Sequence, residues 1–383
     1  MLIREMPITL HWFLPTNGDS RRDLSLGNAV GVEGSRVAGD GGERAPDVGY
    51  IGQIARSAEA LGFAGALTPT SSWCEDAWVM TAALTQVTTT FKFLVAFRPG
   101  LVAPTLAAHM AATYQRVSGG RLLLNVVTGG DDAEQRRFGD RLDKTARYAR
   151  CGEFLHVFRA LWEGESVTFS GEHLSVEDAR IIPAQPRPDI FFGGSSGPAL
   201  EVAARHADVY LTWGEPPAAV AAKLDAVREH AERHGRELRF GIRLHVIARE
   251  TASEAWGEAQ RLLDGLDPAE IERAQAIQRA SGSEGQRRMV ALHGGRTDAL
   301  EIYPNLWAGV GLVRGGAGTA LVGSYEEVAD RIAEYHELGV EEFILSGYPH
   351  LEAAYEVGEG VLPILRGRGL VASHHTDPTT VEV

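Results

Sequence analysis

GYIGQIARSAEALGFAGALT, residues 49–68, contains the unit from which the fold is built. Its first part repeats apolar side chains at the spacing of an amphipathic helix, and its last five residues form a short apolar run of the kind found in buried strands. The same alternation recurs along the chain and predicts strands at 8–13, 64–68, 91–97, 122–127, 189–193, 208–212, 239–247 and 341–347. Helical patterns accompany them at 49–61, 76–88, 104–117, 145–162, 198–206, 217–234, 252–280, 325–338 and 351–360.

Eight strands that alternate with helices predict an α/β fold of the (β/α)8 TIM barrel class. A doubly wound open sheet shares this alternation, but here the polar residues follow the C-terminal ends of the strands, where barrel enzymes place their sites. We expect a single domain at 1–370 and a flexible tail at 371–383. Three long connections are expected as insertions, near 16–48, near 163–188 with a hairpin around Ser170 and Gly171, and at 281–323 as a Gly-rich lid.

Composition narrows the class of protein. The chain has 383 residues, of which 44% are hydrophobic and 23% charged, as in ordinary globular proteins. The formal net charge of -14 argues against a nucleic-acid partner. Only two cysteines occur and no H-E-x-x-H motif is present, so we expect no metal. No signal-peptide core or apolar stretch of about 18 residues is found, which predicts a cytoplasmic protein without membrane contact.

An arginine and a histidine stand two residues apart in the strand expected at 239–247. Because side chains alternate along a strand, Arg243 and His245 share one face, while Ile242 and Leu244 share the other. The apolar face suits packing against helices, so the polar pair is expected to point into the barrel. A buried arginine is costly unless an anion meets it. The alternative is an arginine paired with an internal carboxylate and a histidine bonded to the backbone.

Two glycine-rich segments are candidates for anion contacts. FFGGSS, at 191–196, ends a strand and precedes a helix, which suits a phosphate, although an ordinary turn has the same composition. GVGLVRGG, at 309–316, carries Arg314 and is interpreted as a mobile lid, with a surface loop as the alternative. Cys74 precedes an expected helix whose dipole would favour a thiolate or another polar role, and of these we expect a hydrogen bond near a cofactor. His11 is expected to be a core histidine.

Several longer segments carry a family resemblance. The segments are WFLPTNGD (12–19), CEDAW (74–78), NVVTGGD (125–131), FFGGSS (191–196), YLTWGEPP (210–217), FGIRLHVI (240–247), NLWAGVGLVRGGAGTALVG (305–323) and LSGYPHLE (345–352). Together they resemble the alkanesulfonate monooxygenases of the bacterial luciferase-like superfamily, over residues 8–365. The methanesulfonate-specific enzymes are similar enough to remain candidates.

The resemblance implies a luciferase-like barrel that uses reduced FMN (FMNH2) as cosubstrate, together with O2 and a small alkanesulfonate. The products would be an aldehyde and sulfite. It also implies a separate NAD(P)H-dependent FMN reductase as partner and a homo-oligomer, either a dimer or a tetramer. Our hypothesis for the roles is that Arg314 clamps the sulfonate or the flavin peroxide as the lid closes, Arg243 fixes the anion from the barrel wall, and His245, titrating near its working pH, moves a proton.

Strand ends and the resemblance together define two sets of candidate residues. The predicted catalytic set is Cys74, Trp213, Arg243, His245, Arg314 and Tyr348. The predicted cofactor-binding set is Thr70, Phe97, Asn125, Thr128, Asp131, Tyr148, Gly194, Ser195 and Ser196.

One departure from the family concerns the first long connection. Relatives of the alkanesulfonate enzyme carry a pair of glutamates before Gly-Ser-Arg, where this chain has Val32 and Glu33. This change puts the preferred chain length of the sulfonate in doubt. Three other functions stay open: a monooxygenase of a sulfone or another organosulfur compound, a non-catalytic flavin-binding relative of the luciferase subunits, and a deazaflavin-dependent hydride-transfer enzyme.

Overall fold

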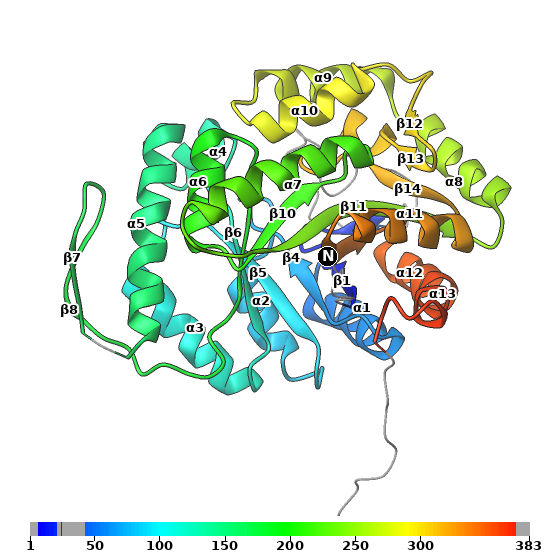
Figure 1. The fold of residues 1–383 in the computed structure, drawn as a ribbon. Coiled ribbons are helices and arrows are strands. Elements are labelled where there is room, and N and C mark those ends of the chain that lie inside the picture. Colours follow the sequence, from blue (N-terminus) through cyan, green and yellow to red (C-terminus); the bar gives the residue numbers. More distant parts are fainter. Residues whose placement is uncertain (1–6, 21–23, 25–42, 165, 373–383) are drawn as a thin grey trace, which may run out of the picture.

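The computed structural model describes residues 7–20, 24, 43–164 and 166–372. Eight parallel strands form a closed barrel in chain order (Figure 1). They are β1 (Thr9–Phe13), β4 (Gly65–Thr68), β5 (Lys92–Phe97), β6 (Leu122–Val126), β9 (Ile190–Gly193), β10 (Val209–Trp213), β11 (Arg239–Arg249) and β15 (Val340–Ser346). β11 closes the barrel by pairing with both β10 and β15. The predicted TIM barrel and all eight predicted strands are therefore confirmed.

A ring of helices covers the outside of the barrel (Figure 1). It consists of α1 (Val48–Leu61), α2 (Ala77–Leu84), α3 (Pro104–Ser118), α5 (Lys144–Trp162), α6 (Gly197–His206), α7 (Pro217–Glu232) and α11 (Tyr325–Glu337), followed by α12 (His350–Tyr355), a π-helical turn (Glu356–Val361) and α13 (Leu362–Gly367). Asp47, Asp76 and Asp143 begin α1, α2 and α5 by accepting a backbone N–H, as good N-cap residues do.

The main hydrophobic core lies between the barrel and this ring, and a smaller apolar cluster fills the barrel. Alternation along β5 decides which residue belongs where: Phe93, Val95 and Phe97 join the outer core, while Leu94 and Ala96 join the inner cluster. His11 on β1 is a buried residue paired with Glu342 at 2.8 Å, so the expectation of a core histidine is confirmed.

The segment after β11 differs from the sequence-based expectation. The single helix expected at 252–280 is wrong, because the chain forms α8 (Ala252–Asp264) and α9 (Pro268–Ala280). Asp267 caps α9 by accepting the N–H of Ala269, and Pro268 has no N–H with which to continue the preceding helix.

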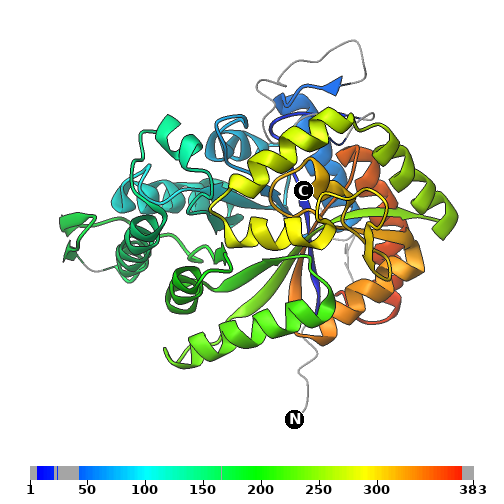
Figure 2. The same cartoon turned by 90° about the horizontal axis from the view of Figure 1, so that it is seen from above.

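The expected lid at 281–323 also has regular structure. It contains α10 (Glu284–His293), β12 (Glu301–Tyr303), β13 (Leu306–Trp307), a 3₁₀ turn (Gly309–Leu312) and β14 (Ala320–Ser324). β14 pairs with the C-terminal half of β11, and β13 and β12 extend this sheet. Seen from above, α9 and α10 lie across the barrel (Figure 2), and these two helices with residues 281–283 between them are called the cover below.

Two further insertions complete the fold. β7 (Val167–Ser170) and β8 (Ser175–Ala179) form the hairpin expected around Ser170 and Gly171, and it projects beyond α5 (Figure 1). β2 (Asp19–Ser20) pairs with β3 (Glu43–Arg44) within the insertion expected near 16–48. Val32, Glu33 and residues 373–383 of the expected tail lie outside the described residues. Among the helices that the structure describes, none has the length and apolar character needed to span a membrane.

Candidate active site

A cavity of about 1130 Å³ opens at the C-terminal ends of the barrel strands. Strand ends form its floor and wall, and α9, α10 and the segment around Arg314 roof it. Thirteen of the fifteen predicted site residues line it: Thr70, Asn125, Thr128, Asp131, Tyr148, Gly194, Ser195, Ser196, Trp213, Arg243, His245, Arg314 and Tyr348. The structure therefore brings residues from eight separate segments of the chain to one cavity, while their chemical roles stay predictions.

Arg243 carries a buried positive charge at the wall of this cavity. Its guanidinium donates to the carbonyl of Leu244 at 2.5 Å and to Ser346 Oγ at 2.8 Å, and it stacks on the ring of Phe13 at 4.8 Å. Within the described part of the chain, Arg243 has no ion pair with a carboxylate. Burial lowers the pKa of Arg243 to about 10, and nearby Arg314 contributes to the decrease. An anion in the cavity would offset the cost of burying this charge.

His245 is held in a single orientation by three groups. Its Nε2 donates to the carbonyl of Ala317 at 2.9 Å, so Nδ1 is the acceptor, and it receives hydrogen bonds from Ser346 Oγ at 2.8 Å and Tyr348 OH at 3.1 Å. Burial and the two neighbouring arginines hold the pKa of His245 well below its ordinary value of 6.5. The expectation that His245 titrates near its working pH is therefore wrong for this state, because a second positive charge beside Arg243 is costly. The imidazole is neutral.

Arg314 extends over the same group of side chains. Its guanidinium lies 4.4 Å from the centre of the Tyr348 ring, and its Nε donates to the carbonyl of Leu24 at 2.6 Å. Gln278 of α9 donates to the carbonyl of Arg314 at 3.1 Å, which ties this segment to the cover. Arg314 is buried, so the alternative of a loose surface loop is wrong.

The turn between β9 and α6 fits a phosphate group. Ser196 occupies the N-cap position of α6, but its side chain caps no backbone N–H, and its Oγ is buried without a hydrogen-bond partner. Gly194 has φ 148°, and a Cβ there would approach Ala199 to 2.6 Å and the hydroxyl of Tyr148 to 3.4 Å. The backbone therefore passes close to Tyr148, and free donors remain at the start of the helix.

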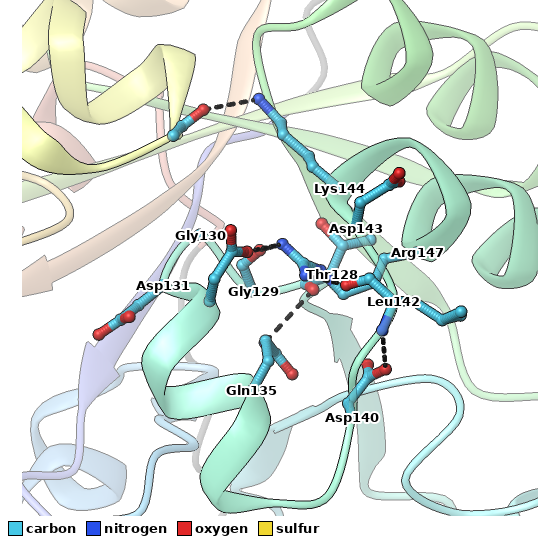
Figure 3. A network of polar contacts seen from close by, with 12 residues as sticks. Thr128, Gly129, Gly130, Asp131, Gln135, Asp140, Leu142, Asp143, Lys144 and Arg147 are labelled. Carbon is cyan, nitrogen blue, oxygen red and sulfur yellow. Dashed lines mark hydrogen bonds and ion pairs between the residues drawn. The ribbon is translucent and has the colours of Figure 1, made fainter.

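The neighbouring turn after β6 has a network of its own (Figure 3). Asp131 caps α4 (Asp132–Arg137) by accepting the N–H groups of Ala133 at 2.8 Å and Glu134 at 3.3 Å. Gly129 has φ 80°, which leaves space for Gln135 to donate to the carbonyl of Thr128 at 3.4 Å. The carboxylate of Asp131 thus shapes this turn while lying at the cavity rim.

Two predicted residues do not line the cavity. Cys74 is buried, and burial raises the pKa of its thiol, so of the two roles considered for it the thiolate is not supported, and its Sγ accepts from Ser71 Oγ at 3.5 Å. Phe97 faces outward, with ring centres 5.7 Å from Trp78 and 5.9 Å from Phe154. Its neighbour Ala96 faces the cavity instead, as alternation along β5 requires.

Sequence reasoning missed a buried polar group at the edge of the cover. Glu215, which follows β10, pairs with Lys223 of α7 and accepts from Arg288 Nε of α10 at 2.6 Å. Lys223 and Arg288 line the cavity. Because Glu215 is 3% exposed and joins the barrel to α10, this group anchors the cover. Its sequence signal was weak, since Lys and Arg on helices are usually solvated.

No group of histidine, cysteine, aspartate and glutamate side chains in the described ranges is arranged to bind a metal ion.

Comparison with known proteins places these features in context. A family model described as luciferase-like monooxygenase matches residues 28–342. A riboflavin lyase, solved with modified FMN and riboflavin, is 21% identical, covers 96% of this chain and 93% of its own, and has a TM-score of 0.77. An EDTA monooxygenase from Chelativorans sp. BNC1 is 19% identical, and the match covers 96% of this chain and 95% of that enzyme, with a TM-score of 0.73. A long-chain alkane monooxygenase is 19% identical, and the match covers 96% of this chain and 92% of that enzyme, with a TM-score of 0.76.

Proposed function

The chain belongs to the luciferase-like monooxygenase family, and from this we propose that it uses reduced FMN and O2 to cleave a small alkanesulfonate into an aldehyde and sulfite. The reaction balances as RCH2SO3⁻ + FMNH2 + O2 giving RCHO + HSO3⁻ + FMN + H2O. The proposal includes a separate reductase that supplies the reduced flavin.

The buried charge of Arg243 is the observation that carries the substrate class. A sulfonate has a full negative charge at neutral pH and several acceptor oxygens, which suit the planar fork of a guanidinium. A neutral alkane would leave this charge unpaired inside the protein. The guanidinium of Arg314 is the second positive group at the same wall, 4.4 Å from the Tyr348 ring.

The second half of the cavity suits FMN. Ser196 and the start of α6 would hold the phosphate, and Tyr148 lies beside them. Asn125 and Thr128 line the same cavity and would contact the ring. When bound, reduced FMN would supply the two electrons that activate O2.

Once a bound sulfonate offsets the charges of Arg243 and Arg314, the neutral imidazole of His245 gives the site a proton acceptor. Formation of the aldehyde removes one proton from the carbon that carries the sulfonate, and Nδ1 of His245 is the basic atom on this wall. Tyr348 OH and Ser346 Oγ both donate to this atom, at 3.1 and 2.8 Å, so a proton can pass through either hydroxyl. The cover would limit the access of water to these steps.

The direct test is sulfite release. The purified protein would receive FMN, NADH, a flavin reductase and O2, with sulfonates from methanesulfonate to octanesulfonate. We expect sulfite only when protein, reduced flavin and O2 are all present, with the best substrate defining the preferred chain length.

Arg228→Met is a matched control for the replacement of Arg243 by methionine. Arg228 stacks on Phe240 at 4.8 Å, as Arg243 does on Phe13, but Arg228 does not line the cavity. Arg228→Met should retain sulfite release, and Arg314→Ala should lose most of it. No sulfite from any sulfonate, despite tight binding of reduced FMN, would refute the proposal and favour a sulfone substrate or a binding role. Turnover with a reduced deazaflavin instead of FMN would favour hydride transfer.

A further inference from the structure

Lysine is rare in this chain, and its distribution is uneven. The 37 basic residues include only three lysines, Lys92, Lys144 and Lys223, and the other 34 are arginines. Two of the three lysines line the active-site cavity. Lysine presents a compact ammonium with three donors, which binds a phosphate as a point charge.

Lys144 is the first residue of α5 and lies one turn before Tyr148. Residues four apart on a helix share a face, and both side chains line the cavity. The ammonium crosses to the cover, where Nζ donates to the carbonyl of Gly282 at 2.9 Å (Figure 3). One donor of the three is thus used by the protein.

The charge of Lys144 has no carboxylate partner within ion-pair distance among the residues described. Burial, followed by repulsion from Arg287, lowers the pKa of Lys144, and the carboxylates of Glu284 and Asp132 offset this decrease only in part. Lys223 differs, because Glu215 neutralises it and Thr212 Oγ1 accepts from it at 3.0 Å. Of the two cavity lysines, Lys144 is therefore the one that can receive an external anion.

The anion-binding groups on this wall all come from neighbouring elements. Tyr148 follows Lys144 on α5, and its hydroxyl lies beside Gly194. Ser196 follows Gly194 and has a buried Oγ without a partner at the start of α6. A dianionic phosphate in this corner would meet hydroxyls and backbone N–H groups on one side and the ammonium on the other.

We propose that Lys144 binds the phosphate of the flavin, so that the site selects FMN over riboflavin and the phosphate becomes linked to the cover. The inference rests on the proposed function, since it concerns the same flavin. Because Lys144 donates to Gly282 of the cover at 2.9 Å, an ammonium shared between that carbonyl and a phosphate joins the two across the cavity rim.

The test compares two flavins that differ only in the phosphate. Reduced FMN and reduced riboflavin would be titrated anaerobically into the protein, with quenching of tryptophan fluorescence as the readout, because Trp73 and Trp213 line the cavity. We expect wild type to prefer FMN. Lys144→Met should weaken FMN binding by about 10-fold or more, since a charge-assisted contact is lost, and leave riboflavin binding within about twofold.

Two controls accompany this variant. Lys144→Arg keeps the charge and should retain most of the preference for FMN. Lys92→Met removes an exposed lysine at the start of β5, which does not line the cavity, and should change neither affinity. Inorganic phosphate should compete with FMN for binding to the wild-type protein. It should compete less with FMN for binding to Lys144→Met.

Equal weakening of FMN and riboflavin in Lys144→Met would overturn the inference, because it would show a role in holding the cover alone. An unchanged FMN affinity would overturn it as well. If wild type releases sulfite while Lys144→Met binds both flavins normally, only this inference fails. If wild type binds neither flavin, the proposed function fails with it.

Discussion

Replacement of Arg243 by methionine should affect stability and activity in opposite directions. The decrease of the Arg243 pKa from its ordinary value to about 10 corresponds to about 3 kcal/mol, at 1.36 kcal/mol per pKa unit. This is the cost of keeping the charge in the folded protein without an anion. Methionine has a similar length, can pack on Phe13, and removes the charge.

Part of the stability gained by removing the charge is lost again, because the substitution also removes hydrogen bonds. Arg243→Met leaves the carbonyl of Leu244 without its donor and removes one bond to Ser346, at about 1 kcal/mol each. The net effect is a stabilisation of about 1 kcal/mol, which urea denaturation at pH 7 can measure. Because Arg243 also depresses the pKa of His245, the imidazole pKa should rise, and NMR titration would detect this change.

Activity should decrease strongly in the same variant. Two charge-assisted hydrogen bonds from the guanidinium to a sulfonate contribute about 3 to 6 kcal/mol, so kcat/KM for sulfite release should fall about 100-fold to 10,000-fold. Arg228→Met should stay within about threefold of wild type. The reasoning would be refuted if Arg243→Met lost more than about 2 kcal/mol of stability, or if its kcat/KM stayed within tenfold of wild type.

Three further changes test separate parts of the structure. Tyr348→Phe removes the donor to His245 but keeps the ring under Arg314, so kcat should fall about 100-fold with little change in KM, and equal changes in both would contradict a proton role. Burial lowers the pKa of His293 from 6.5 to about 4, so the unfolded chain binds this proton first and stability decreases as pH falls from 6.5 towards 4, by about 2 kcal/mol at pH 5. His293→Asn keeps an acceptor for a backbone N–H and should show a smaller loss of denaturation free energy between pH 7 and pH 5, whereas an equal loss would exclude His293 as the source. Gly129→Ala should lower the free energy of unfolding by about 1 to 3 kcal/mol, because φ is 80° and the new Cβ would lie 1.5 Å from an atom of Gln135; an unchanged midpoint in urea would contradict this strain.

The barrel was predictable because each strand has a local signal. Alternation on β11 also placed Arg243 and His245 on the inner face, and the structure confirms this placement. The same rule applied to Phe97 would have shown that Ala96 faces the cavity and Phe97 does not. The break at Pro268 had a signal too, an N-cap aspartate followed by a proline.

Other features depend on contacts between distant parts of the chain. The hydrogen bond from Lys144 to Gly282 joins residues 138 positions apart, and the local sequence around either residue does not predict it. The pKa of His245 depends on burial and on Arg243 and Arg314, which only the folded cavity brings together. β14 follows a glycine-rich run, so its local pattern resembles a loop, and its pairing with β11 reveals it as a strand.

The length of β11 limits how the site can open. Its first half is bonded to β10 of the barrel, and its second half, from His245 onward, is bonded to β14. A single strand therefore belongs both to the barrel and to the sheet of the insertion. The base of the insertion cannot move as a rigid body without breaking the hydrogen bonds between β11 and β14. Any opening is therefore confined to the distal parts of the insertion, which are α9, α10 and the segment that carries Arg314. Substrates of different length would then be admitted by the displacement of these parts alone, while the geometry around Arg243 stays fixed.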